Sequence, residues 1–235
     1  MTKFQLSDCG GLAVLLAGRT VLLRGSGALW LASERALVVA DLHFEKGSSY
    51  AARFGQMLPP YDTRETLTRL EAEVAALEPA TLIFLGDSFH DGAGEDRLAD
   101  DDAARLRALS IGRDLIWAVG NHDADGPSAL PGQVIDEMAI GGLILRHEPE
   151  PGHQPGEVAG HLHPAARVSS GRGSVRKRCF VTDGQRLILP AFGAFTGGLN
   201  ILDEAFAGLF AAPPLAGALG GKRVHAVGPK SLRPD

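Results

Sequence analysis

The chain has 235 residues, of which 45% are hydrophobic and 22% are charged. This apolar content excludes an intrinsically disordered chain. The length fits one globular domain, which we expect to span residues 1–227 and to end in a loose tail at 228–235. The formal net charge of −5 argues against a nonspecific basic coat for nucleic acid but leaves room for a local basic patch.

Cysteine content and hydropathy predict a cytoplasmic protein. The two cysteines, Cys9 and Cys179, form no CxxC pair and cannot make a disulfide framework, which is typical of a reducing compartment. The longest apolar stretch, 205–221, is interrupted by a Pro-Pro pair and by repeated glycines, so we expect no membrane-spanning helix. The apolar run at 12–17 is too short for a typical signal peptide.

Strands and helices alternate along the first half of the chain. Short apolar segments between turns predict strands at 13–17, 21–23 and 29–31, and continuous apolar runs predict buried strands at 36–40, 81–85 and 115–119. We expect Asp62 to cap a helix, with Glu65 completing a capping box and Pro79 ending the helix. A second helix is predicted at 98–109, with acids first and arginines later.

The second half of the chain is richer in predicted strands, at 134–140, 143–146, 166–169, 178–182 and 186–189. The expected class is therefore α/β. Polar residues follow each of the three buried strands of the first half. Because ligands bind beyond the carboxyl ends of strands in open α/β sheets, we expect the functional site to lie there.

Seven side chains have the chemistry of metal ligands: Asp41, His43, Asp87, Asn121, His147, His161 and His163. Residues i and i+2 of an extended segment point the same way, so the Asp-x-His pair could reach one ion together, and so could the His-x-His pair. Imidazole with carboxylate and amide oxygen suits a first-row divalent cation. The absence of cysteine from the set argues against a structural zinc site.

Seven groups are too many for one ion. Two ions about 3.5–4 Å apart that share one ligand would use all of them. Asp87 is the natural bridge because a carboxylate has two oxygens. Two dications and two carboxylates leave a formal charge of about +2, which balances an incoming phosphodiester anion and a hydroxide. The charge match favours phosphoryl chemistry.

The order of these clusters resembles that of the calcineurin-like, two-metal phosphoesterases. The pattern of that superfamily is Asp-x-His, Gly-Asp, Gly-Asn-His-Asp/Glu, a single His and Gly-His-x-His. The matching blocks are Asp41-Leu42-His43, Gly86-Asp87, Gly120-Asn121-His122-Asp123, His147 and Gly160-His161-Leu162-His163. The resemblance implies a two-sheet α/β/β/α sandwich, with helices outside and a dinuclear metal site at the carboxyl ends of strands.

The same resemblance implies a role for each block. The first metal would be held by Asp41, His43 and His163, the second by Asn121, His147 and His161, with Asp87 bridging. His122 would lie over the phosphate, where it would stabilise charge or protonate the leaving oxygen, and Asp123 could orient its imidazole. Many members carry an acidic residue three positions after the bridging aspartate. His90 stands there in this chain, and it could contact substrate phosphate or brace the metal loop.

A narrower resemblance covers nearly the whole chain. Segments 39–49, 58–63, 85–91 and 189–198 are similar to the bacterial ligase-associated DNA-damage-response phosphoesterases, a subfamily assigned as DNA endonucleases. The similarity implies manganese-dependent phosphodiester cleavage, with single-stranded DNA as substrate and a role in DNA repair. It also implies functional association with a DNA ligase, a helicase and an exonuclease.

Several alternatives remain open. Histidine-rich sites take zinc or iron as readily as manganese. The same metal site would serve a small-molecule nucleotide phosphodiesterase or pyrophosphatase, or a phosphomonoesterase. A degenerate site would leave a noncatalytic scaffold that binds proteins. The chain could also form an oligomer.

Three further segments allow two interpretations each. The densest basic run, Arg172, Arg176, Lys177 and Arg178, could track a nucleic-acid backbone or form a solvated hairpin. Segment 46–49 could bind a phosphate through backbone amides, or its serines could cap a helix. Segment 192–198 is glycine-rich but lacks a P-loop ending, so we expect a tight loop near the site rather than a nucleotide cradle.

Overall fold

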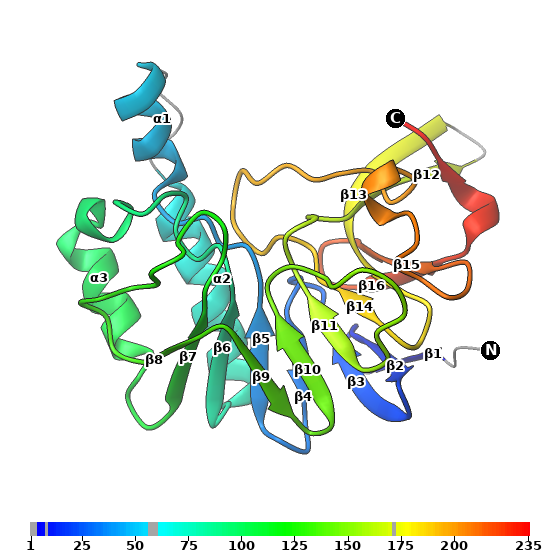
Figure 1. The fold of residues 1–235 in the computed structure, drawn as a ribbon, viewed down its shortest axis with the longest axis horizontal. Coiled ribbons are helices and arrows are strands. Elements are labelled where there is room, and N and C mark those ends of the chain that lie inside the picture. Colours follow the sequence, from blue (N-terminus) through cyan, green and yellow to red (C-terminus); the bar gives the residue numbers. More distant parts are fainter. Residues whose placement is uncertain (1–3, 8, 56–60, 171–172) are drawn as a thin grey trace.

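The computed structural model describes residues 4–7, 9–55, 61–170 and 173–235, which form two packed sheets with α-helices on one side (Figure 1). Residues 58–60 of the subfamily resemblance and Arg172 of the basic run lie outside the described residues. The α/β class and the two-sheet architecture expected from the sequence are confirmed.

The first sheet contains eight strands, in chain order, among the described residues. They are β1 Phe4–Leu6, β2 Leu12–Leu16, β3 Arg19–Leu23, β4 Leu29–Leu31, β5 Ala36–Val39, β6 Thr81–Leu85, β7 Asp114–Ala118 and β8 Gln133–Ile135. Pairs from β1 to β5 are antiparallel, and pairs from β5 to β8 are parallel. The carboxyl ends of β5, β6 and β7 therefore meet at one edge, where ligands bind in such sheets.

The second sheet contains nine strands within the described ranges. They are β9 Glu137–Ile140, β10 Leu143–Arg146, β11 Glu157–Ala159, β12 Ala165–Ser170, β13 Gly173–Thr182, β14 Leu187–Ile188, β15 Leu215–Leu219, β16 Val224–Val227 and β17 Leu232–Arg233. The order is β16-β15-β13-β14-β11-β10-β9, and β12 pairs with both β13 and β17. Because β10, β11 and β14 are parallel neighbours, the loops after β10 and β11 leave the sheet side by side.

Helices cover the face of the first sheet that points away from the second sheet. The α-helices are α1 Lys46–Phe54, α2 Asp62–Leu77 and α3 Asp100–Ala108. The 3-10 turns are η1 Glu95–Arg97 and, beside the second sheet, η2 Glu204–Phe206 and η3 Pro229–Ser231. Leu67 of α2 and Leu106 of α3 pack in one buried cluster with Phe84 and Trp117, whose rings stack with centroids 3.9 Å apart. No helix of the described segments combines the length and apolarity needed to cross a bilayer.

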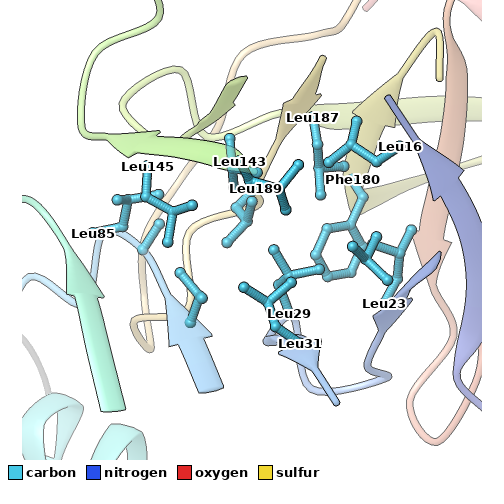
Figure 2. Packing of buried hydrophobic residues seen from close by; sticks show 14 of the residues in the cluster. Leu16, Leu23, Leu29, Leu31, Leu85, Leu143, Leu145, Phe180, Leu187 and Leu189 are labelled. Atoms are coloured by element: carbon cyan, nitrogen blue, oxygen red, sulfur yellow. The ribbon is translucent and has the colours of Figure 1, made fainter. Parts of the chain in front are cut away.

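The main core lies between the two sheets. Leu23 and Leu29 of the first sheet belong to one buried cluster with Leu145, Phe180 and Leu187 of the second (Figure 2). A smaller cluster on the outer side of the second sheet joins β13 and β15 to the segment around η2. Within the described part of the chain, loops and 3-10 turns form this outer layer, whereas the resemblance implied α-helices outside both sheets.

Two local predictions are wrong. The single strand expected at 134–140 is two strands, β8 and β9, because the chain crosses from the first sheet to the second at Asp136. Asp62 does not cap α2, since Tyr61 is the N-cap residue and makes no side-chain cap bond. The Asp62 carboxylate instead accepts the Gly47 N–H of α1 at 2.9 Å, so the capping box with Glu65 does not form.

The C-terminal segment differs from the loose tail expected at 228–235. It forms η3 and then β17, which pairs with β12. Leu232 is buried, and Asn200 donates a hydrogen bond to the Arg233 carbonyl at 2.9 Å. These contacts make the segment an edge of the second sheet.

Candidate metal centre

A left-handed backbone is shared by five of the seven expected metal ligands. They are Asp41 (φ 53°), His43 (φ 46°), Asp87 (φ 45°), His161 (φ 66°) and His163 (φ 45°). Non-glycine residues rarely adopt this conformation, and such strain clusters at functional sites. The chain therefore turns sharply after β5, β6 and β11 instead of continuing as an extended strand. We expected the Asp-x-His and His-x-His side chains to point the same way because alternate residues of a strand do so. Their positions depend on these turns instead.

One group of donors contains Asp41, His43, Asp87 and His163, whose ligand atoms all lie within 4.8 Å of one another. His163 Nε2 lies 3.1 Å from Asp41 Oδ1 and 3.2 Å from His43 Nε2. His43 Nε2 lies 3.8 Å from Asp87 Oδ2. Such separations match ligand atoms around one ion with bonds of about 2.0–2.2 Å.

A second group contains Asp87, His147 and His161. His147 Nε2 lies 3.4 Å from Asp87 Oδ1, 3.3 Å from His161 Nδ1 and 3.2 Å from Asn121 Oδ1. Asp87 thus faces the first group with Oδ2 and the second with Oδ1. His161 and His163 lie in different groups, so the structure does not bring this pair together around one point.

Backbone contacts hold both buried carboxylates and one imidazole in place. Asp41 accepts the His161 N–H at 3.1 Å, and Asp87 accepts the His122 N–H at 2.9 Å. His147 donates from Nδ1 to the Leu85 carbonyl at 3.1 Å, which directs Nε2 toward Asp87. A second hydrogen bond of this kind fixes the tautomer and direction of a metal-ligating histidine.

The electrostatics of the cluster favour cations. Burial and the neighbouring His163 lower the pKa of His43 to about 2. Burial opposes charge on His147 as well, but the Asp87 and Asp41 carboxylates outweigh it and raise the pKa of His147 to about 9. The carboxylates therefore favour a proton on His147, and a bound dication would take the place of that proton. Imidazole nitrogens with carboxylate and amide oxygens suit first-row divalent ions, so the residues present fit a dinuclear site.

His122 lies at the open side of this cluster. Its side chain is 37% exposed, and its Nε2 lies 4.0 Å from Asp87 Oδ2. Nδ1 donates to the His90 carbonyl at 2.7 Å, so that carbonyl orients the ring. Asp123 does not orient it, which corrects the expectation, because the Asp123 carboxylate accepts the N–H groups of Phe89 and Gly120 instead.

His90 also lies beside the cluster, between it and α1. Its Nδ1 lies 3.4 Å from His43 Nδ1, and its ring contacts the rings of His122 and Tyr50. Burial and the nearby Lys46 lower the pKa of His90 to about 4. Tyr50 was not expected at the site, although its i, i+4 spacing from both Lys46 and Phe54 on one helix was a usable signal.

The glycine-rich segment at 192–198 packs directly against the turn after β5. Gly193 donates its N–H to the Asp41 carbonyl at 3.1 Å, and a Cβ on Gly193 would lie 2.0 Å from the Leu42 oxygen. A Cβ on Gly198 would lie 2.1 Å from the His163 oxygen. The segment is a tight loop near the site, as predicted, and it also packs against the backbone beside two expected ligands.

The basic run divides into three different environments. Arg178 donates to the carbonyls of Ala191 and Gly193 at 2.8 and 2.9 Å, and burial lowers its pKa to about 10. Arg176 pairs with Asp235 at 3.0 Å, and the Lys177 side chain is exposed. Arg178 is therefore a support for the loop rather than part of an open track for a nucleic acid.

The start of α1 overturns the serine-cap interpretation of segment 46–49 and removes one amide, that of Gly47, from the phosphate interpretation. The N-cap residue is Glu45, in a left-handed conformation without a side-chain cap bond. The Gly47 amide is taken by the Asp62 carboxylate, and Ser48 Oγ donates to the Glu45 carbonyl. These contacts leave neither a serine N-cap nor a free Gly47 amide for phosphate.

Comparison with known proteins identifies related chains. A family model described as calcineurin-like phosphoesterase matches residues 34–188, which include all seven expected ligands. The crystal structure of Pseudomonas putida nuclease MPE is 32% identical, with a TM-score of 0.69 over 96% of this chain and 100% of that chain. Yfce, a phosphoesterase from E. coli, is 15% identical, with a TM-score of 0.42 over 82% of this chain and 98% of that chain. No curated protein sequence matches significantly.

Proposed function

The chain belongs to the calcineurin-like phosphoesterases, and from that premise we propose that it is a two-metal phosphodiesterase that cleaves single-stranded DNA internally. The observation that carries the proposal is the position of Asp87, whose two oxygens face two separate groups of donors. The similarity to a nuclease over 96% of the chain supports DNA as the substrate class.

We propose the ligand assignment that the family pattern implies. Asp41, His43 and His163 would bind one ion and Asn121, His147 and His161 the other, with Asp87 between them. The bound ions, for which Mn²⁺ is our first choice and Zn²⁺ or Fe the alternatives, would supply charge stabilisation and a water of lowered pKa. Donor atoms spaced 3.1 to 3.8 Å apart support this assignment.

His122 is proposed to act on the leaving group. The His90 carbonyl holds Nδ1–H, so Nε2 is the atom that faces the donor cluster. A proton held at Nε2 could be passed to the departing sugar oxygen, and an exposed ring can meet a polymeric substrate. General acid catalysis of this kind contributes typically about 10²–10⁴-fold.

The test is a substrate panel with metal-stripped protein reloaded with Mn²⁺, Zn²⁺ or Fe²⁺. The substrates are circular single-stranded DNA, circular duplex DNA, a nucleotide pyrophosphate and a phosphomonoester. We expect the single-stranded circle to be linearised fastest, since only internal cleavage opens a circle. Exclusive turnover of the pyrophosphate or the monoester would replace the DNA assignment, and inactivity with every metal would favour a scaffold.

We also propose that the protein works in DNA repair together with a DNA ligase, a helicase and an exonuclease. The support is the subfamily resemblance of the segments around both the metal centre and the loop at 189–198. Co-purification of the tagged protein from cells with damaged DNA tests the association. Recovery of none of the three enzymes, and equal survival of cells lacking the protein, would contradict it.

A further inference from the structure

Four aromatic rings form a continuous row from the tip of α1 to the candidate metal centre. We call Phe54, Tyr50, His90 and His122 the ring row. The ring centroids of Phe54 and Tyr50 lie 5.5 Å apart, those of Tyr50 and His90 5.5 Å apart, and those of His90 and His122 5.2 Å apart. Each distance lies in the range of contacting aromatic pairs.

The ring row is open to solvent at its outer end. Phe54 is 67% exposed, and α1 projects away from the two sheets (Figure 1). Phe54 and Tyr50 are four residues apart and so share one face of the helix. A single exposed phenylalanine needs no explanation, but a row that ends at the reactive groups is not accounted for by core packing.

Cations lie beside the ring row. Lys46 Nζ lies 5.9 Å from the Tyr50 ring centroid. Arg53 has a side chain that is 60% exposed and lies 3.6 Å from Asp91. Arg97 already holds both Asp91 oxygens at 2.9 Å, and α1 itself contains no acidic residue. An exposed ring at Phe54, a half-buried ring at Tyr50 and positive charge therefore occur together on α1.

We propose that the ring row is the stacking platform for unpaired bases of the single-stranded substrate. Bases would stack on Phe54 and Tyr50 while phosphates follow Lys46 and Arg53 toward His122. Single-strand-binding proteins combine aromatic stacking with positive charge in this way, and stacking is tolerant of sequence. Bases in a duplex are already paired and stacked, so the row gives a physical reason for preference for single strands. The inference rests on the proposed function.

The experiment compares two substrates of equal length and charge, a thymidine oligonucleotide and an oligomer of stable abasic sites. Steady-state kinetics with Mn²⁺ are measured for the wild type and for Tyr50→Leu, Phe54→Leu and Tyr50→Trp. The matched control is Tyr61→Leu, which removes an exposed tyrosine outside the row. Hydrolysis of bis-p-nitrophenyl phosphate, which has no bases, is followed in parallel to report on the metal centre.

The wild type should have a lower KM for the thymidine oligomer than for the abasic one. Tyr50→Leu and Phe54→Leu should each raise the KM for the thymidine oligomer about 10-fold and leave the abasic KM unchanged. Tyr50→Trp and Tyr61→Leu should keep the wild-type discrimination. Equal wild-type KM values, or variants that raise both KM values together, would overturn the proposal.

Failure of the proposed function would look different. A wild type that hydrolyses bis-p-nitrophenyl phosphate but cleaves neither oligomer would contradict the nuclease assignment, and the stacking platform with it. A wild type that cleaves thymidine oligomers, combined with leucine variants that keep the wild-type KM, would contradict the stacking platform alone. The two failures are therefore separable in one set of assays.

Discussion

The candidate metal centre has a buried floor and an open rim. The floor consists of Asp41, Asp87 and His147, with exposures of 0%, 2% and 5%. Backbone groups fix each of them, through the amides of His161 and His122 and the Leu85 carbonyl. Buried charges held in this way need a compensating partner, since an unpaired buried carboxylate is costly.

The rim is built differently. The side chain of His122 is exposed and that of His90 is partly exposed. His122 is held at Nδ1 by one carbonyl and by contact with the His90 ring, and its Nε2 faces the donor cluster from the open side. The contrast indicates two different functions. The residues of the floor are positioned to hold cations, and the residues of the rim are positioned to contact the molecule that is cleaved.

Removal of the floor carboxylate should have the largest effect. Asp87→Ala takes away the group that both sets of donors share, so we expect bound metal to fall below one ion per chain and diester turnover to drop by at least about 10³-fold. Metal content after dialysis and turnover with added Mn²⁺ measure this. Asp136→Ala, an exposed aspartate between the two sheets, is the control. A fully loaded and active Asp87→Ala protein would contradict the bridging role.

Removal of the rim histidine should separate catalysis from metal binding. His122→Ala should retain both ions but lose about 10²–10⁴-fold in DNA turnover, because the proposed proton donor is gone. The loss should be smaller for a nitrophenyl diester, whose leaving group needs little protonation. His153→Ala, an exposed histidine outside the cluster, is the control. If turnover fell equally for both substrates, or if metal were lost, His122 would act in holding the ions and not as a proton donor.

Much of the floor was predictable because its signals are local. Continuous apolar runs predicted β5, β6 and β7, and Asp41, Asp87 and Asn121 follow these strands at the shared edge, as the rule for parallel sheets requires. The positions of His147, His161 and His163 came from the order of motifs in the resemblance. Nothing in periodicity relates a residue after β10 to one after β6.

Features that depend on distant contacts were not predictable in this way. The pattern at 134–140 is equally compatible with one strand or with two, and only the packing of both sheets divides it at Asp136. Asp62 has the chemistry of a cap, but α1 supplies a competing amide at Gly47. The sequence around Arg178 predicts an exposed cation, because nothing in it indicates the loop carbonyls that the guanidinium binds.

A glycine beside the floor tests how closely its parts are packed. Gly86 has φ +77°, and a Cβ there would lie 2.2 Å from His147 Nδ1, so Gly86→Ala should displace that imidazole. We expect roughly 2–4 kcal/mol less stability in denaturant unfolding, which combines backbone strain with the clash. Gly112→Ala is the matched control because Gly112 has φ +73° with nothing within 4 Å. If both variants lost the same free energy of unfolding, the loss would come from backbone strain alone, and the clash with His147 would contribute nothing.

The smallest expected effect concerns two neighbours in the basic run. Lys177 is exposed to solvent, whereas the Arg178 side chain is bound to backbone carbonyls. Lys177→Glu should weaken single-stranded DNA binding about 3-fold and lower the salt slope by about 1, because an exposed cation contributes one screened phosphate contact. Arg178→Gln should mainly reduce stability, since its guanidinium binds the Ala191 and Gly193 carbonyls. Binding at several salt concentrations and denaturant unfolding measure both. If Arg178→Gln lowered the salt slope and left stability unchanged, Arg178 would be a contact to the DNA backbone and not a support for the loop.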